Sequence, residues 1–510
     1  MAAPILRDDA LTARPDGFEL RLSLPWIRSM PLACVTELSV VIGGARCDVA
    51  VALGDREIPP ADLAREDAWW FLQDRLVLRG SASLGPGAHR VEALFRLVVP
   101  YLAGGPDGPL VLPLREEREL DPSVHRASAS RDVCGEVAPT TGASPAAEAS
   151  IGATGGPSGS DDAGGGAGPA HGGSPISGTA DRAPATTLPD EWRLSANAFN
   201  WTPDVVRAHR TAHDIVVGIV ADGVASVIEV EPGQVWPAFP APSSDDVLRL
   251  RNDVAAVGGS VSMVGASIDD WVGTARRRDD DERLAFLLPQ LRAASLVGAE
   301  GVRLPLGHAG RPLLERLLPV LEELDLVLYE EVQGQQAPSG AAFDDIADLD
   351  DPRLRVLVDT SMLMPALPVT YLERMTSLPA ELHARLREEW RDPATHEAVI
   401  AALRGGSGPP ELRTTFMNLI VRFGRSTAAD LRPILSLVGA VHLKFWDLDD
   451  TDGRVSTPIR ELGSELARSG FAGALCSEWG GHDWLNAEAT DMTRAHLALA
   501  RQALAEGAAA

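Results

Sequence analysis

The chain has 510 residues and a formal net charge of −26, with 45% hydrophobic and 23% charged residues. This composition is typical of globular proteins, and the length suffices for about two or three domains with buried cores. The strong negative charge argues against nucleic acid and anionic membranes as partners. No apolar run reaches the roughly eighteen residues of a membrane-spanning helix, so none is expected.

The cysteines and the N-terminus indicate the compartment. The four cysteines are scattered without the spacing of a metal site, at Cys34, Cys47, Cys134 and Cys476. The first residues lack the basic start and apolar run of a signal peptide. Both features favour a reduced compartment, and we expect a cytoplasmic protein.

Residues 10–120 show the pattern of a small β domain. Between Phe18 and Leu24, apolar and polar residues alternate with the period of two that marks a half-buried strand. Short strands separated by Gly and Pro turns predict a sandwich or an open barrel. The expected strands cover residues 18–24, 35–42, 46–53, 76–78 and 90–99.

The composition changes over residues 123–190. This stretch is rich in Gly, Ala, Ser and Pro and contains almost no large apolar residues. Such a sequence cannot bury enough apolar surface to offset the entropy lost on ordering. We therefore expect a disordered linker that keeps the flanking domains at a high effective concentration.

Residues 192–506 alternate short apolar segments with helical stretches. The segments read as buried parallel strands, and the alternation predicts strand–helix units that close into a (β/α)8 TIM barrel, an α/β fold. The expected strands cover residues 196–201, 224–231, 260–264, 301–306, 327–333, 355–361, 440–445 and 474–479. The connection between the sixth and seventh strands is unusually long and helix-forming, so it is a candidate lid or interface element.

The last four expected strands each carry a possible metal ligand. The four residues are Glu331, Asp359, His442 and Glu478. Strand ends converge on one face of a TIM barrel, so these side chains would meet around a single point. Three carboxylates and one imidazole suit a divalent ion such as Mn²⁺ or Mg²⁺. Because Glu330 and Glu331 are neighbours on a strand, they point to opposite sides, and only one can face the metal.

The sequence around these residues resembles a known family. The order Glu, Asp, His, Glu on four late strands is similar to the xylose isomerase-like sugar isomerase/epimerase barrels. More narrowly, residues 192–504 resemble the catalytic subunit of C-glycoside deglycosidases, and this resemblance selects Glu331 over Glu330. The motifs that carry it are Glu331-Val332-Gln333-Gly334, Asp359-Thr360-Ser361-Met362, His442-Leu443-Lys444-Phe445-Trp446 and Ser477-Glu478-Trp479-Gly480-Gly481-His482.

The N-terminal segment resembles the small partner subunit of the same deglycosidases. The similar features are Leu24-Pro25-Trp26-Ile27-Arg28-Ser29-Met30-Pro31-Leu32, Trp69-Trp70 and Leu97-Val98-Val99-Pro100-Tyr101. On physical grounds, Trp26, Trp69 and Trp70 are expected to be core or interface anchors. The chain would then join two subunits that are separate in relatives, with the N-terminal domain supporting the barrel.

The resemblance implies a metal-dependent reaction of the lyase type. A divalent ion, Mn²⁺ first with Mg²⁺ or Co²⁺ as alternatives, would polarise the carbonyl of a 3-oxo-glycoside that a separate sugar oxidoreductase supplies. Loss of the neighbouring proton and β-elimination would cleave the C- or O-glycosidic bond and release the aglycone. We also expect a homo-oligomer.

Two other functions remain open from the residues. Reprotonation of the same enediolate would make the protein a sugar isomerase or epimerase, and a degenerate barrel would make it a non-catalytic carbohydrate-binding protein. Many keto-sugar epimerases carry a His three residues after the Asp ligand, where this chain has Met362. This difference disfavours the epimerase, and the complete ligand set disfavours the binding protein.

The general base has several candidates. His308 follows the fourth strand, beside the first ligand-bearing strand, and imidazole titrates near working pH; alternatively it is a surface loop histidine. His482 could contact the substrate or cap the last helix. Lys444 shares a strand face with His442, so it could stabilise enolate charge or pair with an acid. Weaker candidates on the second strand are Glu229 and Glu231.

Overall fold

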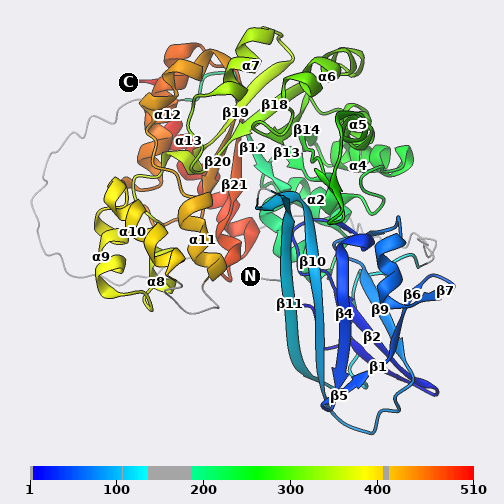
Figure 1. The fold of residues 1–510 in the computed structure, drawn as a ribbon. Coiled ribbons are helices and arrows are strands. Elements are labelled where there is room, and N and C mark those ends of the chain that lie inside the picture. Colours follow the sequence, from blue (N-terminus) through cyan, green and yellow to red (C-terminus); the bar gives the residue numbers. More distant parts are fainter. Residues whose placement is uncertain (1–3, 106, 136–186, 406–412) are drawn as a thin grey trace, which may run out of the picture. The chain divides into compact units, whose positions relative to one another are not determined.

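A computed structural model describes residues 4–105, 107–135, 187–405 and 413–510 (Figure 1). These residues belong to one compact unit that spans Met1–Gly135 and Thr187–Ala510. Within the described ranges, no helix is both long and apolar enough to cross a membrane.

The expected linker lies mostly outside the described residues, which resume at residue 187. Its first part, residues 123–135, is structured. Val133 is buried there, and its amide donates to the carbonyl of Arg75 in the N-terminal region. The structured chain therefore continues past residue 123, because this segment still carries an apolar side chain that packs against the core.

The N-terminal region forms two antiparallel sheets and a short two-stranded pair (Figure 1). One sheet has the strand order β1-β2-β9-β6-β7, with β1 Leu11–Arg14, β2 Gly17–Ser23, β9 Arg75–Gly80, β6 Val49–Leu53 and β7 Arg56–Ile58. The other has the order β11-β10-β4-β5, with β11 Gly108–Leu120, β10 His89–Gly105, β4 Val35–Ile42 and β5 Ala45–Cys47. The pair joins β3 Met30–Pro31 to β8 Trp69–Trp70. The predicted strand-rich N-terminal region is confirmed.

The single strand expected at residues 46–53 is in fact two strands in different sheets. β5 pairs with β4, whereas β6 pairs with β9. Asp48 separates them at the point where the chain passes from one sheet to the other. The residues after the break, Val49–Leu53, form an uninterrupted apolar run, and such a run does not state which strand it pairs with.

The C-terminal region is a closed barrel of parallel strands, which confirms the predicted TIM barrel (Figure 1). Around the barrel the strands are β12 Trp192–Asn197, β13 Val227–Val230, β14 Ser260–Gly265, β17 Gly301–Pro305, β18 Val327–Val332, β19 Leu354–Asp359, β20 Val438–Phe445 and β21 Gly473–Trp479. The longer helices between and after them are α2 Ala212–Ala221, α4 Ser244–Ala256, α5 Asp280–Val297, α6 Arg311–Leu324, α7 Ala341–Leu349, α12 Ser456–Ser469 and α13 Ala489–Ala508.

The first barrel strand lies earlier than the expected residues 196–201. β12 ends at Asn197, whose side-chain oxygen accepts a hydrogen bond from the amide of Phe199 at 2.9 Å. This contact starts a 3₁₀ turn, η3 Ala198–Trp201, and so ends the strand. Asn favours such local caps over a continuing strand.

A helical insertion occupies the connection between β19 and β20. Its helices are α8 Val369–Arg374, α9 Ala380–Glu388, α10 Pro393–Arg404 and α11 Arg413–Val421. They pack around an apolar cluster distinct from the barrel core. Within it, the ring of Phe423 lies 4.8 Å from Tyr371 and 6.3 Å from Trp390, both edge-on. Edge-on aromatic pairs of this kind stabilise a small core beyond their buried area.

The end of the insertion lies directly on the loops that follow β18 and β19. The amide of Gly424 donates to the carbonyl of Ser361 at 2.7 Å. A Cβ atom on Gly424 would lie only 2.2 Å from the carbonyl oxygen of Gly334, so only glycine allows this approach. The insertion is therefore fastened beside the strand ends that carry the candidate metal ligands.

Candidate metal centre

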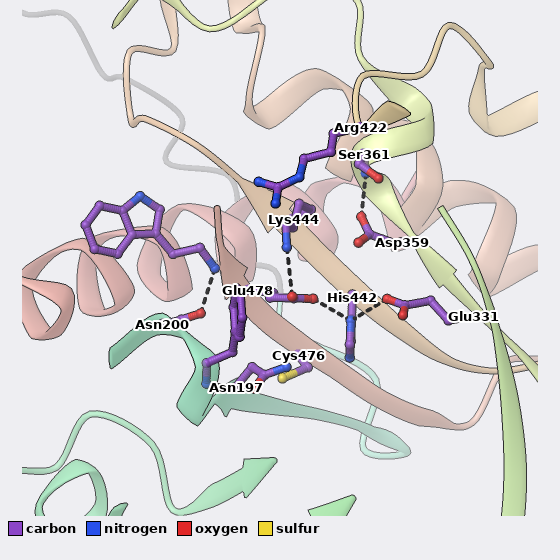
Figure 2. A network of polar contacts seen from close by, with 12 residues as sticks. Asn197, Asn200, Glu331, Asp359, Ser361, Arg422, His442, Lys444, Cys476 and Glu478 are labelled. Carbon is purple, nitrogen blue, oxygen red and sulfur yellow. Dashed lines mark hydrogen bonds and ion pairs between the residues drawn. The ribbon is translucent and has the colours of Figure 1, made fainter. Parts of the chain in front are cut away.

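Four side chains from successive strands converge at the C-terminal end of the barrel (Figure 2). Glu331, Asp359, His442 and Glu478 each offer one ligand atom, and these atoms lie within 4.8 Å of one another. All four are buried, Glu478 being the most exposed at 7%. Parallel pairing explains the convergence, since Asp359 and His442 are direct partners across β19 and β20.

Nδ1 of His442 lies between two of the carboxylates. It is 2.9 Å from Oε1 of Glu331 and 2.5 Å from Oε2 of Glu478. Despite these short distances, Nδ1 and Glu478 Oε2 form no hydrogen bond of acceptable geometry among the described residues. Buried polar atoms of this kind call for another partner. A divalent cation matches them, because hard carboxylate oxygens and one imidazole nitrogen are ligands that Mn²⁺ and Mg²⁺ accept.

Burial and neighbouring charges set the protonation of the carboxyl groups. Burial opposes ionisation of Glu478, but Lys444, His442 and Arg303 together outweigh it and hold the pKa well below its ordinary value. Burial is likewise outweighed at Glu331, where Arg303 and His442 together lower the pKa. At Asp359 burial dominates and raises the pKa to about 7. Two of the three carboxylates are thus held ionised by neighbouring positive charges, of which Lys444 contributes most at Glu478 and Arg303 most at Glu331.

Those two cations are part of the site. Nζ of Lys444 lies 2.7 Å from Oε1 of Glu478 (Figure 2), and Nη1 of Arg303 lies 2.7 Å from Oε2 of Glu331. Arg303 also pairs with Glu231. Our sequence interpretation missed Arg303. The available signal is that Arg303 is the only charged residue of β17, an otherwise apolar strand that reads as buried.

Backbone hydrogen bonds orient Asp359. Its Oδ1 accepts from the amide of Ser361 at 2.7 Å (Figure 2), and the hydroxyl of Ser361 accepts from the amide of Gly334 at 2.9 Å. On the other side, the hydroxyl of Thr360 accepts from the amide of Lys444 at 2.7 Å. The turn after β19 is therefore fastened to both neighbouring strands, which fixes the direction of the Asp359 carboxylate.

His308 lies in the turn that follows β17. Glu330 and Glu331 are neighbours on β18, so their side chains point to opposite faces of the strand. Oε2 of Glu330 accepts a hydrogen bond from the amide of Gly307 at 2.9 Å. Glu330 thereby fixes the turn that carries His308. Burial lowers the pKa of His308, whose charged neighbours are Asp270 and Arg283.

His482 and Lys444 share an aromatic neighbour. The ring of His482 lies 5.1 Å from Phe199, and Nζ of Lys444 lies 5.4 Å from the same ring. His482 is only 5% exposed, and burial lowers its pKa to about 4. Of the three leading sequence candidates for catalysis, Lys444 makes a direct contact with a candidate ligand, and so does the weaker candidate Glu229.

The fold is a closed parallel TIM barrel that carries a buried cluster of four possible metal ligands. No family model matches the chain. Among solved structures, D-psicose 3-epimerase is 14% identical with a TM-score of 0.36, covering 61% of this chain and 99% of that one. The 3-keto-D-glucoside 4-epimerase from E. coli is 15% identical with a TM-score of 0.34 and the same coverage.

Curated relatives make the assignment more specific. A C-glycoside deglycosidase alpha subunit from Arthrobacter globiformis is 26% identical over 329 residues, 61% of this chain and 92% of the relative. A 3'-dehydrocarminate deglycosidase beta subunit from Microbacterium sp is 38% identical over 109 residues, 20% of this chain and 83% of the relative. The chain belongs to the C-glycoside deglycosidase family, and it matches both an alpha and a beta subunit.

Proposed function

We propose that this protein cleaves the glycosidic bond of 3-oxo-glycosides by metal-dependent β-elimination and releases the aglycone. One observation carries the proposal: a buried four-ligand cluster lies in a chain that belongs to the C-glycoside deglycosidase family. The names of the relatives supply the substrate class, a C-glycoside and a 3'-dehydro compound. Both C- and O-glycosides fit the chemistry.

Glu331, Asp359, His442 and Glu478 would hold the ion, and Mn²⁺ is the ion we expect. When bound, a divalent ion polarises a sugar carbonyl and acidifies the C–H bond beside it. The protein side chains keep this region dry, because all four ligands are buried. Exclusion of water strengthens every electrostatic interaction in the site.

The organic steps need a base and a cation. The base takes the proton from the carbon next to the carbonyl, and the electron pair of that C–H bond forms an enolate. The enolate then expels the group at the anomeric carbon, which leaves with the bonding electrons and takes up a proton. Burial acts to lower the pKa of Lys444, but Glu478 and Asp359 raise it above its ordinary value. Lys444 therefore remains an ammonium that stabilises the enolate charge.

We assign the base to His308. Pro305, at the end of β17, is the direct partner of Glu331 on β18, and His308 follows three residues later. A general base works best when its pKa lies near the working pH. His482, with a pKa of about 4, suits that role less well and packs against Phe199 instead.

Oxidation of the glycoside at C3 must precede this reaction, so a separate sugar oxidoreductase is the expected source of the substrate. The test is to incubate the purified full chain with a 3-oxo-C-glycoside and with its unoxidised parent. We expect free aglycone only from the 3-oxo compound, loss of that activity with chelator, and its return with Mn²⁺. A chelator-insensitive rate, or epimerised sugar without aglycone, would contradict the proposal.

A further inference from the structure

The carboxylate of Glu229 contacts His442 from within the barrel. Two strands separate β13, which carries Glu229, from β20, which carries His442, so the contact crosses the barrel interior. Oε2 of Glu229 lies 2.9 Å from Nε2 of His442, within hydrogen-bond distance. The two residues are 2% and 0% exposed. Glu229 is outside the four-ligand set and has no part in the proton transfers above.

This contact determines which imidazole nitrogen carries hydrogen. A carboxylate oxygen pairs with a ring nitrogen at this distance when that nitrogen carries hydrogen, so Nε2 of His442 is the nitrogen that donates to Glu229. In a neutral imidazole the other nitrogen, Nδ1, then keeps its lone pair. Nδ1 is the atom that faces the candidate metal ligands, 2.9 Å from Glu331 and 2.5 Å from Glu478.

The same contact fixes the direction of the ring. The two imidazole nitrogens flank Cε1 and point in divergent directions in the plane of the ring, so holding Nε2 in place also fixes the direction of Nδ1, which faces the cluster. Histidines that bind metals commonly donate their second N–H to a carboxylate in this way, which sets the tautomer and the ring orientation.

We propose that Glu229 is a positioning residue, which holds His442 in the Nε2–H tautomer and points Nδ1 at the metal ion. This inference rests on the proposed metal site and extends it by one residue on a different strand. Glu229 contacts Nε2, whereas the four-ligand cluster contacts Nδ1, so Glu229 acts through His442 and not as a fifth ligand.

Two substitutions of Glu229 distinguish the effect of its hydrogen bond from the effect of its side-chain volume. Glu229→Leu removes the acceptor, whereas Glu229→Gln keeps an amide oxygen that can accept from Nε2–H. Glu330→Gln is the matched control, because Glu330 is an equally buried carboxylate whose hydrogen bond goes to Gly307. Unfolding midpoints and circular dichroism of the full-length variants would show whether each is folded.

The first readout is Mn²⁺ affinity, measured by calorimetry. We expect Glu229→Leu to weaken binding by about 10- to 100-fold, the scale found when such supporting partners are lost. Glu229→Gln should recover most of the affinity, and Glu330→Gln should keep it. The second readout is the ¹⁵N spectrum of the Mg²⁺-loaded protein, with His442→Asn used to assign the signal. We expect the Nε2–H tautomer in wild type and its loss in Glu229→Leu.

The outcomes of these measurements test the role of Glu229 separately from the metal site. Wild-type Mn²⁺ affinity and an unchanged tautomer in Glu229→Leu would overturn the role of Glu229 while leaving the metal site intact. Equal losses in the Leu and Gln variants would also overturn it, because the acceptor would then not be the cause. A wild-type chain that binds no divalent ion would instead overturn the proposed metal site together with this inference.

Discussion

Nζ of Lys444 lies 2.7 Å from Oε1 of Glu478, and the two residues face each other on the neighbouring barrel strands β20 and β21. Both side chains are largely buried, so the ion pair is shielded from solvent. The ammonium is thus held beside a candidate metal ligand, where negative charge would develop on a bound sugar. Lys444 would thus have two roles that can be tested separately. It keeps Glu478 ionised, and it stabilises the negative charge of the enolate.

Lys444→Met should lower kcat by about 10²- to 10³-fold, since one preorganised charge at the developing oxyanion is lost. The bound ion itself would balance Glu478, so the metal content should stay at the wild-type level. Lys444→Arg, which keeps the charge, should recover part of the rate. Wild-type kcat in the Met variant would reduce Lys444 to a structural partner of Glu478.

His308→Ala should lower turnover by roughly 10²- to 10⁴-fold, the usual scale for a removed acid–base group. Metal content should be unchanged, because His308 is not one of the four ligands. The rate of aglycone release from a 3-oxo-glycoside and the bound metal are measured together, with His482→Ala made in parallel. If only the His482 variant loses activity, the base is assigned to the wrong histidine.

The N-terminal region should support the barrel through a buried ion pair. Arg28, from the N-terminal region, pairs with Asp269 of the barrel region, and the side chains are 10% and 1% exposed. Removing one partner of such a pair leaves an unpaired buried charge and costs about 3–5 kcal/mol. We therefore expect Arg28→Ala to lower the free energy of unfolding by that amount in urea titrations.

A double-mutant cycle completes this prediction. The Arg28→Ala/Asp269→Ala double variant should lose clearly less than the sum of the two single variants, because no charge is left unpaired. Strict additivity of the two losses would mean that the ion pair does not couple the N-terminal region to the barrel.

The stability of the protein should depend on pH through His496. Burial lowers its pKa from 6.5 to about 3, and its Nδ1 lies 2.8 Å from the hydroxyl of Ser477. As the pH falls below 6.5, the unfolded chain takes up a proton at this residue while the folded chain does not, so the free energy of unfolding decreases. The contribution is present in full above pH 6.5 and is lost at about 1.4 kcal/mol per pH unit as the pH falls towards 3.

His496→Gln removes this titration. Between pH 4 and 6, the unfolding free energy should change less steeply with pH in the variant. The expected difference in slope is about 1.4 kcal/mol per pH unit, the value for one bound proton. Urea titrations at several pH values give the slope. An identical slope in both proteins would show that His496 is protonated in the folded state within this range.

The sequence predicts most of the barrel and the convergence of the four ligands for a simple reason. Glu331, Asp359, His442 and Glu478 each lie in the C-terminal half of a short, largely apolar segment, and the C-terminal ends of barrel strands meet on one face. Both the segment and the polar residue within it are local features of the sequence, and the barrel symmetry supplies the rest. Their role as metal ligands stays a prediction.

The contacts that support those ligands are not local. Arg303 reaches both Glu331 and Glu231, and Glu229 reaches His442 across two intervening strands. Which side chains face each other across the interior depends on strand register, which a single sequence does not state. The end of β12 is not predicted for a different reason. Asn197 caps the turn Ala198–Trp201, whose residues are also compatible with a continuing strand.

The most direct measurement of the central claim is the metal content of the wild-type chain and of Asp359→Ala, determined on purified protein saturated with Mn²⁺. Asp359 is buried, and its carboxylate is held in the cluster by the amide of Ser361. We predict one ion per wild-type chain and none in the folded Asp359→Ala variant, with aglycone release lost in parallel. Full occupancy in the variant, or no ion in the wild type, would contradict the assignment of this cluster as the metal centre.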